Sequence, residues 1–518
     1  PQAKDIVDKM ANQATHKMVT PEFLRSAAKQ SERCLVVPVR LRRAIKGFLR
    51  EQAEPHLKRK VQRLSETFSG IKEKQLLLAG ATSQEAKEEP FSSKDSRDQR
   101  WKIKSSYGDI GFTYSDDETL AYVASRMPAV YSACYRVLSE VRRRLPDFAP
   151  AKVLDFGAGT GSAFWAMREV WPKSIEKMNI VEPSQSMQRA GRSLIQDLKG
   201  LPLIHGYQSI VSLTKDIKKS DREHDLVIAS YVLGEIPSVK DRISTVRQLW
   251  GLTRDVLVLI EPGTPHGFEI ISLMRSHILW MEKRKCRKAK KKDAEPCKDL
   301  VDLKSGAFVV APCAHDGHCP LERSGKYCHF AQRLQRTSSQ RAYKRFKGEA
   351  LRGFEDEKFS FVVLRKGQRP REPWPLDGVQ FETLREQHAR RNPEDLEIDH
   401  VEDDTEQSQD EDDDDDNGEN IPRAVQRVGY ESDIMESDTL EDSEEEPDEQ
   451  AYANLGGGWG RIMFMPVRRG KRVTVDVCRS ANQEASEGSL ERFVVTKGKN
   501  PTLHHLARKS YWGDLWPY

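Results

Sequence analysis

The pattern of apolar and polar residues changes along the chain and predicts four segments. Residues 1–104 place apolar side chains at helical spacing among many basic residues and end in a polar, turn-rich stretch, which indicates a basic helical extension and linker. Residues 105–393 alternate short apolar runs with helical stretches, whereas residues 394–452 have few apolar positions. Residues 453–518 alternate apolar with polar or basic residues, so we expect a small antiparallel β unit there.

The second segment has the pattern of a doubly wound α/β domain. Apolar runs at 151–156, 225–230, 255–261 and 359–366 read as strands of one sheet. A helix is expected to begin at a capping box made by Ser115 and Glu118, to break at Pro128 and to run to about residue 144. Because strands and helices alternate, we expect the sheet to be parallel.

A glycine-rich turn follows the first of these strands. Asp155 closes the strand, and Gly157, Gly159 and Gly161 follow it in a turn that suits residues without side chains. The fingerprint of dinucleotide-binding proteins has its third glycine one position later, so NAD is not favoured. The pattern resembles the S-adenosylmethionine site of class I methyltransferases, in which Glu182, after the next strand, would accept the ribose hydroxyls. The alternative is a glycine turn without a ligand.

Composition separates an acidic segment from a basic body. The chain has 518 residues and a formal charge of +4, but residues 401–450 contain about 23 acids and only two arginines, which leaves about +25 on the rest. So basic a body favours a polyphosphate partner such as RNA, although a solvated lysine-rich surface is the alternative. The acidic stretch has too few apolar side chains to offset the cost of ordering it, so residues 394–452 are predicted to be a disordered insertion.

The chain's length and its first residue set further limits. A chain of 518 residues has room for about two to four domains. No apolar run reaches the roughly 18 residues that span a bilayer, so no membrane partner is expected. Because the sequence begins at Pro1 without a methionine or signal peptide, we expect that an upstream targeting segment has been removed.

The cysteines predict a metal site and a reducing compartment. The eight cysteines are unevenly spaced, which is not typical of a disulfide framework. Cys313, Cys319 and Cys328 lie within sixteen residues of a loop at about 306–332, and thiols so close together favour a shared soft metal over three unliganded cysteines.

Two kinds of metal centre suit this spacing. Zinc would take its fourth ligand from a local histidine, at position 315, 318 or 329. An iron–sulfur cluster would prefer a fourth cysteine, and Cys478, at the end of a predicted strand, is the best remote candidate. Spacing alone does not choose between the two.

No catalytic residue for methyl transfer is predicted. The segment after the strand at 225–230 reads SYVLGEIP and lacks the (N/D)PP(Y/F) loop of base-amine methyltransferases. The strands at 225–230 and 255–261 also offer no cysteine nucleophile, and no lysine base for ribose methylation can be placed. Glu235 and Glu261 are candidates to orient a substrate, but carboxylates at strand ends are more often structural or cofactor-facing.

The full set of motifs resembles the methyltransferase-like proteins of the mitochondrial small ribosomal subunit, the Rsm22-type family. The resemblance covers about 105–370 and 455–518 and rests on SRMPAVYSACYRVL, LDFGAGTG, SYVLGEIP, IEPGTPHGFEIISLMR, the cysteine loop and VTVDVC. It implies a protein of the mitochondrial matrix that binds small-subunit ribosomal RNA and ribosomal proteins, not DNA, as an assembly or subunit-associated factor.

The resemblance also has implications for cofactors and catalysis. It implies a [4Fe–4S] cluster held by Cys313, Cys319, Cys328 and Cys478, together with a retained S-adenosylmethionine pocket. We expect a scaffold that does not transfer methyl groups, and the alternative is an active ribosomal RNA methyltransferase.

Overall fold

The computed structural model describes the two predicted folded segments and parts of the N-terminal extension. The described residues are 17–18, 21–52, 59, 61, 114–236, 238–292, 306–322, 324–343, 353–370, 379–380 and 459–517. Most of the expected linker and the whole predicted acidic insertion, 394–452, lie outside the described residues.

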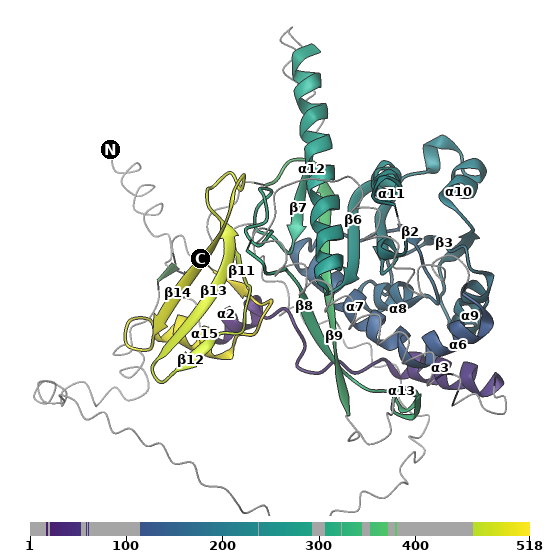
Figure 1. The fold of residues 1–518 in the computed structure, drawn as a ribbon, viewed down its shortest axis with the longest axis horizontal. Helices are drawn as coiled ribbons and strands as arrows, with labels where there is room; N and C mark the ends of the chain where they lie inside the picture. The colour runs from purple at the N-terminus through teal and green to yellow at the C-terminus, as the bar shows by residue number, and fades with distance from the viewer. Residues whose placement is uncertain are drawn as a thin grey trace, which may run out of the picture.

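One sheet of eight strands forms the centre of the molecule (Figure 1). Its order is β4-β3-β2-β5-β6-β9-β7, and β8 pairs with β9. The strands are β2 (Lys152–Phe156), β3 (Lys177–Val181), β4 (Leu203–Tyr207), β5 (His224–Ser230), β6 (Thr253–Pro262), β7 (Ala307–Ala311), β8 (Phe330–Gln335) and β9 (Phe354–Lys366). The five neighbouring strands β4, β3, β2, β5 and β6 are mutually parallel, as predicted. The prediction of a wholly parallel sheet is wrong for β9, which pairs antiparallel with β6, β7 and β8.

Helices cover both faces of this sheet. The first face is covered by α6 (Asp116–Ser125), α7 (Met127–Arg144), α8 (Ser162–Val170) and α9 (Gln185–Ile195), and the second by α10 (Ile210–Asp216), α11 (Val239–Leu252) and α12 (Pro265–Lys292). Neighbouring strand residues point to opposite faces, so Val153 lies in the first core and Leu154 in the second. The fold is therefore the predicted doubly wound class I arrangement.

The helical boundaries before the glycine turn follow the sequence closely. Ser115 and Glu118 form the predicted capping box at the start of α6. The expected break falls at Arg126, and Pro128 lies in the first turn of α7, where its missing N–H group costs no hydrogen bond.

The C-terminal residues form a second, antiparallel sheet, as predicted. It contains β11 (Gly460–Ile462), β12 (Val467–Arg469), β13 (Arg472–Ser480), β14 (Gly488–Thr496) and β15 (Leu515–Trp516), with α15 (Pro501–Lys509) packed against it. The N-terminal helix α2 (Pro21–Ala28) completes its core, because Leu24 and Ala28 are buried in the same cluster as Val475 and Trp516. The sequence did not predict that the two ends of the chain fold together.

The remaining described elements are short or lie on the first face of the main sheet. Helix α3 (Val39–Glu51) buries Leu41, Ile45 and Leu49 in the first core. The others are β1 (Lys17–Met18), η1 (Lys219–Asp221), η2 (Leu233–Glu235), α13 (Ser338–Tyr343) and β10 (Val379–Gln380). Among the described residues, no helix combines the length and the apolar content that crossing a membrane requires.

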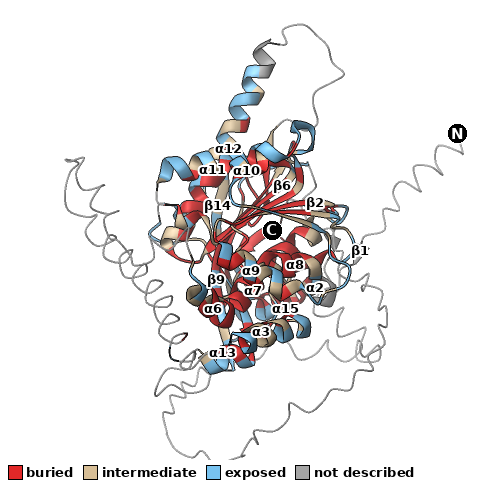
Figure 2. Ribbon diagram, turned by 90° about the vertical axis from the view of Figure 1, so that its right-hand side faces the viewer, coloured by how far each residue is buried: buried red, intermediate tan, exposed pale blue. Residues whose placement is uncertain are grey.

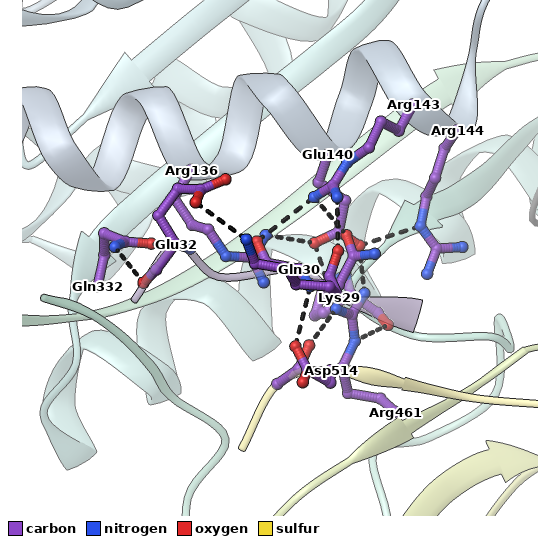
Figure 3. Close-up of polar contacts among 12 residues, drawn as sticks. Lys29, Gln30, Glu32, Arg136, Glu140, Arg143, Arg144, Gln332, Arg461 and Asp514 are labelled. Atoms are coloured by element: carbon purple, nitrogen blue, oxygen red, sulfur yellow. Dashed lines mark hydrogen bonds and ion pairs between the residues drawn. The ribbon is translucent and has the colours of Figure 1, made fainter. Parts of the chain in front are cut away.

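A buried ionic cluster joins the C-terminal unit to the main domain (Figure 3). Glu140 of α7 is fully buried and accepts hydrogen bonds from Arg136, Arg144 and Arg461, the last of which belongs to β11. Burial opposes ionisation of Glu140, but the charges of Arg461, Arg144 and Arg136 outweigh it and hold the pKa of the carboxyl well below its usual range. A second contact of this kind ties in the N-terminal segment, since Arg25 pairs with Asp514 at 2.7 Å.

Candidate functional site

Three glycines shape the turn between β2 and α8. Gly157, Gly159 and Gly161 have φ angles of 70°, 53° and 89°, in the left-handed region that L side chains rarely adopt. A Cβ atom on Gly157 would also lie 2.5 Å from Cγ2 of Val232, so the space there is filled. The turn brings its backbone close to the carboxyl ends of the parallel strands, where α/β proteins bind ligands.

Glu182 lies beside this turn, as predicted. Its carboxylate accepts a hydrogen bond of 2.9 Å from the N–H group of Gly159 and one of 2.8 Å from that of Ser184. Burial raises the pKa of Glu182, although these two hydrogen bonds act in the opposite direction. Each carboxylate oxygen keeps a further lone pair, so the group can still accept hydrogen bonds from a diol.

Asp155 is the residue of this site that most clearly lacks a partner. It is fully buried at the end of β2, and among the described residues neither of its carboxylate oxygens has a hydrogen-bond partner. Burial, with a contribution from the charge of Glu182, raises the pKa of Asp155 to about 7. A buried carboxylate without a partner is costly, and a cationic ligand such as S-adenosylmethionine would compensate it. The five predicted pocket residues therefore fit this cofactor.

Two more carboxyl groups belong to the same region. Glu235, in η2, accepts a hydrogen bond of 2.9 Å from the hydroxyl of Tyr114. Burial raises its pKa to about 8, and the nearby charges of Glu182 and Glu261 act in the same direction. Glu261, at the end of β6, accepts backbone hydrogen bonds from Leu233 and Gly234, and burial raises its pKa to about 7. Sequence reasoning identified both glutamates but missed Tyr114, because no motif surrounds it.

The position after β5, where many methyltransferases bind their acceptor, makes structural contacts. Tyr231 has a φ angle of 59° and donates a hydrogen bond of 2.9 Å to Glu357 of β9. Arg126 donates two hydrogen bonds of 3.0 Å to the same carboxylate. The Tyr231 side chain thus fixes the end of β5 to β9.

The four candidate cysteine ligands come from two parts of the fold that meet. Cys478 of β13 is buried with Leu321 and Met463, and Cys319 and Cys328 pack against this cluster. Cys313 follows β7 and packs against the second core. Backbone contacts join the two parts as well, because the N–H group of Asp316 donates to the carbonyl of Ala485 over 2.7 Å.

The thiols influence one another electrostatically. Burial raises the pKa of Cys319 to about 12, with the charge of Cys313 acting in the same direction. Burial also raises the pKa of Cys328, and the charges of the other three cysteines add to this shift. The chemistry of the donor set, four thiols of which one is buried and three are partly buried, suits a soft metal centre whose binding would displace their protons.

The histidines offered as zinc ligands occupy three different environments. His315 is buried, and its Nε2 atom lies 3.5 Å from Sγ of Cys478. The side chain of His318 is 94% exposed, and His329 stacks on Tyr327 and makes a tilted ring contact with Trp512. Within the described part of the chain, no three histidine, cysteine or carboxylate side chains converge tightly enough to hold a single metal ion.

The sheet order, the glycine turn and the acidic strand ends together define a class I methyltransferase-like protein. A family profile described as mitochondrial small ribosomal subunit Rsm22 matches residues 116–390 and 428–517. The chain belongs to this family, as the sequence motifs predicted.

Relatives with curated names agree with this assignment. The human "Ribosome assembly protein METTL17, mitochondrial" is 30% identical over 278 residues, which are 52% of this chain and 54% of that protein. The Saccharomyces cerevisiae "Ribosome assembly protein RSM22, mitochondrial" is 26% identical over 474 residues, covering 77% of this chain and 67% of that protein. The chain thus spans about half the length of the human relative. The expected mitochondrial location agrees with both names.

Solved structures add little to the topology. The magnesium protoporphyrin IX methyltransferase of Synechocystis is 10% identical, with a TM-score of 0.25, over 46% of this chain and 85% of that one. The fold assignment rests on the strand order described above.

Proposed function

We infer that this protein assists assembly of the mitochondrial small ribosomal subunit, in the matrix, and that it binds ribosomal RNA through a methyltransferase-like scaffold. The observation that carries the inference is the family match, which spans both the main sheet and the C-terminal unit. The basic balance of the chain outside residues 401–450 supports a polyanionic partner. Ribosomal proteins next to the bound RNA are the second expected class of partner.

The pocket at the strand ends is proposed to bind S-adenosylmethionine as a stabilising ligand. Asp155, Glu182 and the glycine turn would hold the cofactor, and the unpartnered carboxylate of Asp155 supports this assignment. Binding to the folded state alone stabilises that state by mass action. When bound, the cofactor supplies a methyl group on a sulfonium centre.

The alternative, an active ribosomal RNA methyltransferase, is supported by the same pocket. Glu235 has its pKa raised to about 8, so near neutral pH its carboxyl can exchange a proton with an acceptor. This alternative is weakened because Tyr231, at the position where an acceptor would bind, is hydrogen-bonded to Glu357 and holds β5 to β9. We therefore favour the scaffold.

The four cysteines are proposed to hold a [4Fe–4S] cluster. This proposal is supported by the packing of Cys319 and Cys328, from the loop, against the buried cluster that contains Cys478. A cluster spreads its ligands over several metal atoms, so it does not require the convergence on one point that a zinc ion requires. Such a cluster would connect the C-terminal unit to the main domain covalently through its metal–thiolate bonds.

The direct test is anaerobic purification followed by analysis of iron, acid-labile sulfide and zinc, with bound S-adenosylmethionine assayed on the same sample. We expect about four irons and four sulfides per chain, as the cluster's composition requires. One zinc without sulfide would contradict the cluster and turn attention to His315, the histidine nearest Cys478. Absence of any metal would leave the cysteines without this role.

A further inference from the structure

Helix α12 continues well past the core that holds its first half (Figure 1). Ile270, Ile271, Met274 and Ile278 are buried in the second core. Glu282 is the last buried position, where it accepts a hydrogen bond of 2.9 Å from the indole of Trp250. Beyond it, the described side chains up to residue 288 are exposed except for the partly buried Cys286, and Figure 2 shows pale blue turns on this part of α12.

The exposed part carries basic side chains around much of its circumference. They are Lys283, Arg284, Lys285, Arg287 and Lys288, and we call residues 283–288 the basic arm. At 100° per residue these five positions span about 200° around the axis. Helices that are polar on so many sides are not held by packing, and they lack the apolar face with which a helix lies on a membrane.

The sequence of the arm works against an isolated helix. Lys283 and Arg287, and likewise Arg284 and Lys288, are like charges four residues apart, and such pairs destabilise a helix. Among the described residues, one ion pair reduces the repulsion within the arm, and in it Nζ of Lys285 lies 2.6 Å from Oε1 of Glu282. A polyanion lying along the arm would remove the repulsion and release its own counterions.

An aromatic residue lies at the base of the arm on its exposed side. The Trp280 side chain is 56% exposed, and the guanidinium of Arg284 lies 5.3 Å from the centre of its ring. His277 lies next to it, one turn earlier, with a ring distance of 6.2 Å. Burial and the nearby charge of Arg247, on α11, lower the pKa of His277. An exposed indole beside arginine is a platform on which an unpaired base stacks.

We propose that the basic arm and Trp280 bind a single-stranded segment of RNA. The lysine and arginine side chains of the arm would contact its phosphates, and a nucleobase would stack on the indole. This deepens the proposed function and rests on it, since the RNA would be that of the small subunit. An acidic peptide would satisfy the charges but would leave the exposed indole without a use. The sequence analysis did not predict that the basic residues after Glu282 continue a helix of the core.

The test measures binding of the full chain to a fluorescein-labelled, 20-nucleotide single-stranded RNA of mixed sequence by anisotropy at several salt concentrations. The arm variant replaces Lys283, Arg284, Arg287 and Lys288 by Gln. A matched control replaces four exposed lysines elsewhere by Gln, at positions 199, 215, 218 and 219. We expect the arm variant to bind at least tenfold more weakly and to lose about 3 from the slope of log K against log salt, at ~0.7 per phosphate contact. The control should stay close to wild type.

Trp280→Ala tests the second half of the site without changing charge. We expect a roughly tenfold loss of affinity for single-stranded RNA with an unchanged salt slope, because stacking releases no counterions. An unchanged affinity in both variants, or an equal loss in the control, would overturn the proposal while leaving the proposed function standing. A wild-type chain that binds no RNA would overturn both.

One further experiment distinguishes RNA from an acidic peptide as the partner of the basic arm. A synthetic peptide covering residues 401–450 is added as a labelled probe in place of the RNA. If the arm substitutions abolish binding of the peptide but leave that of the RNA intact, the arm is a site for acidic peptides and the proposal is wrong.

Discussion

Asp155 is a buried carboxylate whose two oxygens have no hydrogen-bond partner among the described residues. Its pKa is raised to about 7, so the folded state holds a proton that the unfolded state releases near pH 4. The stability that this proton contributes is fully present below about pH 4 and is lost as the pH rises through 7. Glu235 and Glu261, with pKa values raised to about 8 and 7, act in the same direction.

We therefore predict that S-adenosylmethionine raises the melting temperature more at pH 8 than at pH 5.5. At pH 8 Asp155, which has no hydrogen-bond partner among the described residues, is mostly ionised, and the sulfonium charge would compensate it. Differential scanning fluorimetry at both pH values measures this. S-adenosylhomocysteine, which lacks the sulfonium charge, is the matched ligand control, and an equal shift with both compounds would contradict the electrostatic explanation.

Asp155→Asn tests the same residue from the protein side. We expect the ligand-free variant to lose less stability than wild type between pH 5.5 and 8, because one carboxyl no longer ionises in the core. Binding of S-adenosylmethionine should weaken at least tenfold, measured by calorimetry. A variant that keeps wild-type affinity would show that Asp155 does not face the cofactor.

Glu140 is the opposite case, a buried carboxylate compensated by three arginines. Glu140→Gln leaves Arg461 buried without its charge partner, so we predict a loss of about 3–5 kcal/mol in the free energy of unfolding. Urea denaturation measures it. Arg333→Gln, which breaks an exposed pair with Asp356, is the control and should cost less than about 1 kcal/mol. Equal effects of the two substitutions would contradict a special role for the Glu140 cluster.

At the scale of elements, the cysteine loop and β13 are predicted to depend on one another. Cys319→Ser should remove the broad absorbance near 400 nm that iron–sulfur clusters give, and it should make the C-terminal unit more sensitive to protease. Cys286→Ser is the matched control, because Cys286 lies on α12 and is partly exposed. An unchanged spectrum in Cys319→Ser, with the cluster present in wild type, would remove this loop from the ligand set.

Local elements were predictable where one sequence pattern fixed them. The glycine turn and the capping box at Ser115 each follow from spacing within about ten residues, and the parallel strands follow from the alternation of strands and helices. The antiparallel pairing of β9 did not follow, because a buried strand is apolar on both faces in either direction. The acidic insertion and most of the linker lie outside the described residues, so those two predictions stay open.

The site was less predictable than the fold, because its contacts join distant parts of the chain. Asp155, Glu182 and the cysteines could be named from motifs, but Tyr114 lies 121 residues from Glu235, to which it donates a hydrogen bond. Likewise the pairing of α2 with the C-terminal sheet depends on a shared core that no local pattern encodes. In the sequence Arg461 is one basic residue among many, and only the structure shows that it forms a buried ion pair with Glu140.

At the scale of the whole molecule, the two ends of the chain and the main domain form one connected body. The C-terminal sheet is completed by α2, joined to α7 through Glu140, and placed against the cysteine loop at Cys478. We propose that this body serves ribosome assembly as a scaffold and that methyl transfer is not required.

The measurement that tests this claim most directly is small-subunit assembly in cells that lack the endogenous protein and express either wild type or Asp155→Asn. Sucrose gradients report the small subunit, and mass spectrometry of its ribosomal RNA reports methyl marks. We predict that Asp155→Asn, expressed at the wild-type level, restores the small subunit and leaves every methyl mark in place. Loss of one specific mark together with failed assembly would contradict it and identify the protein as a methyltransferase.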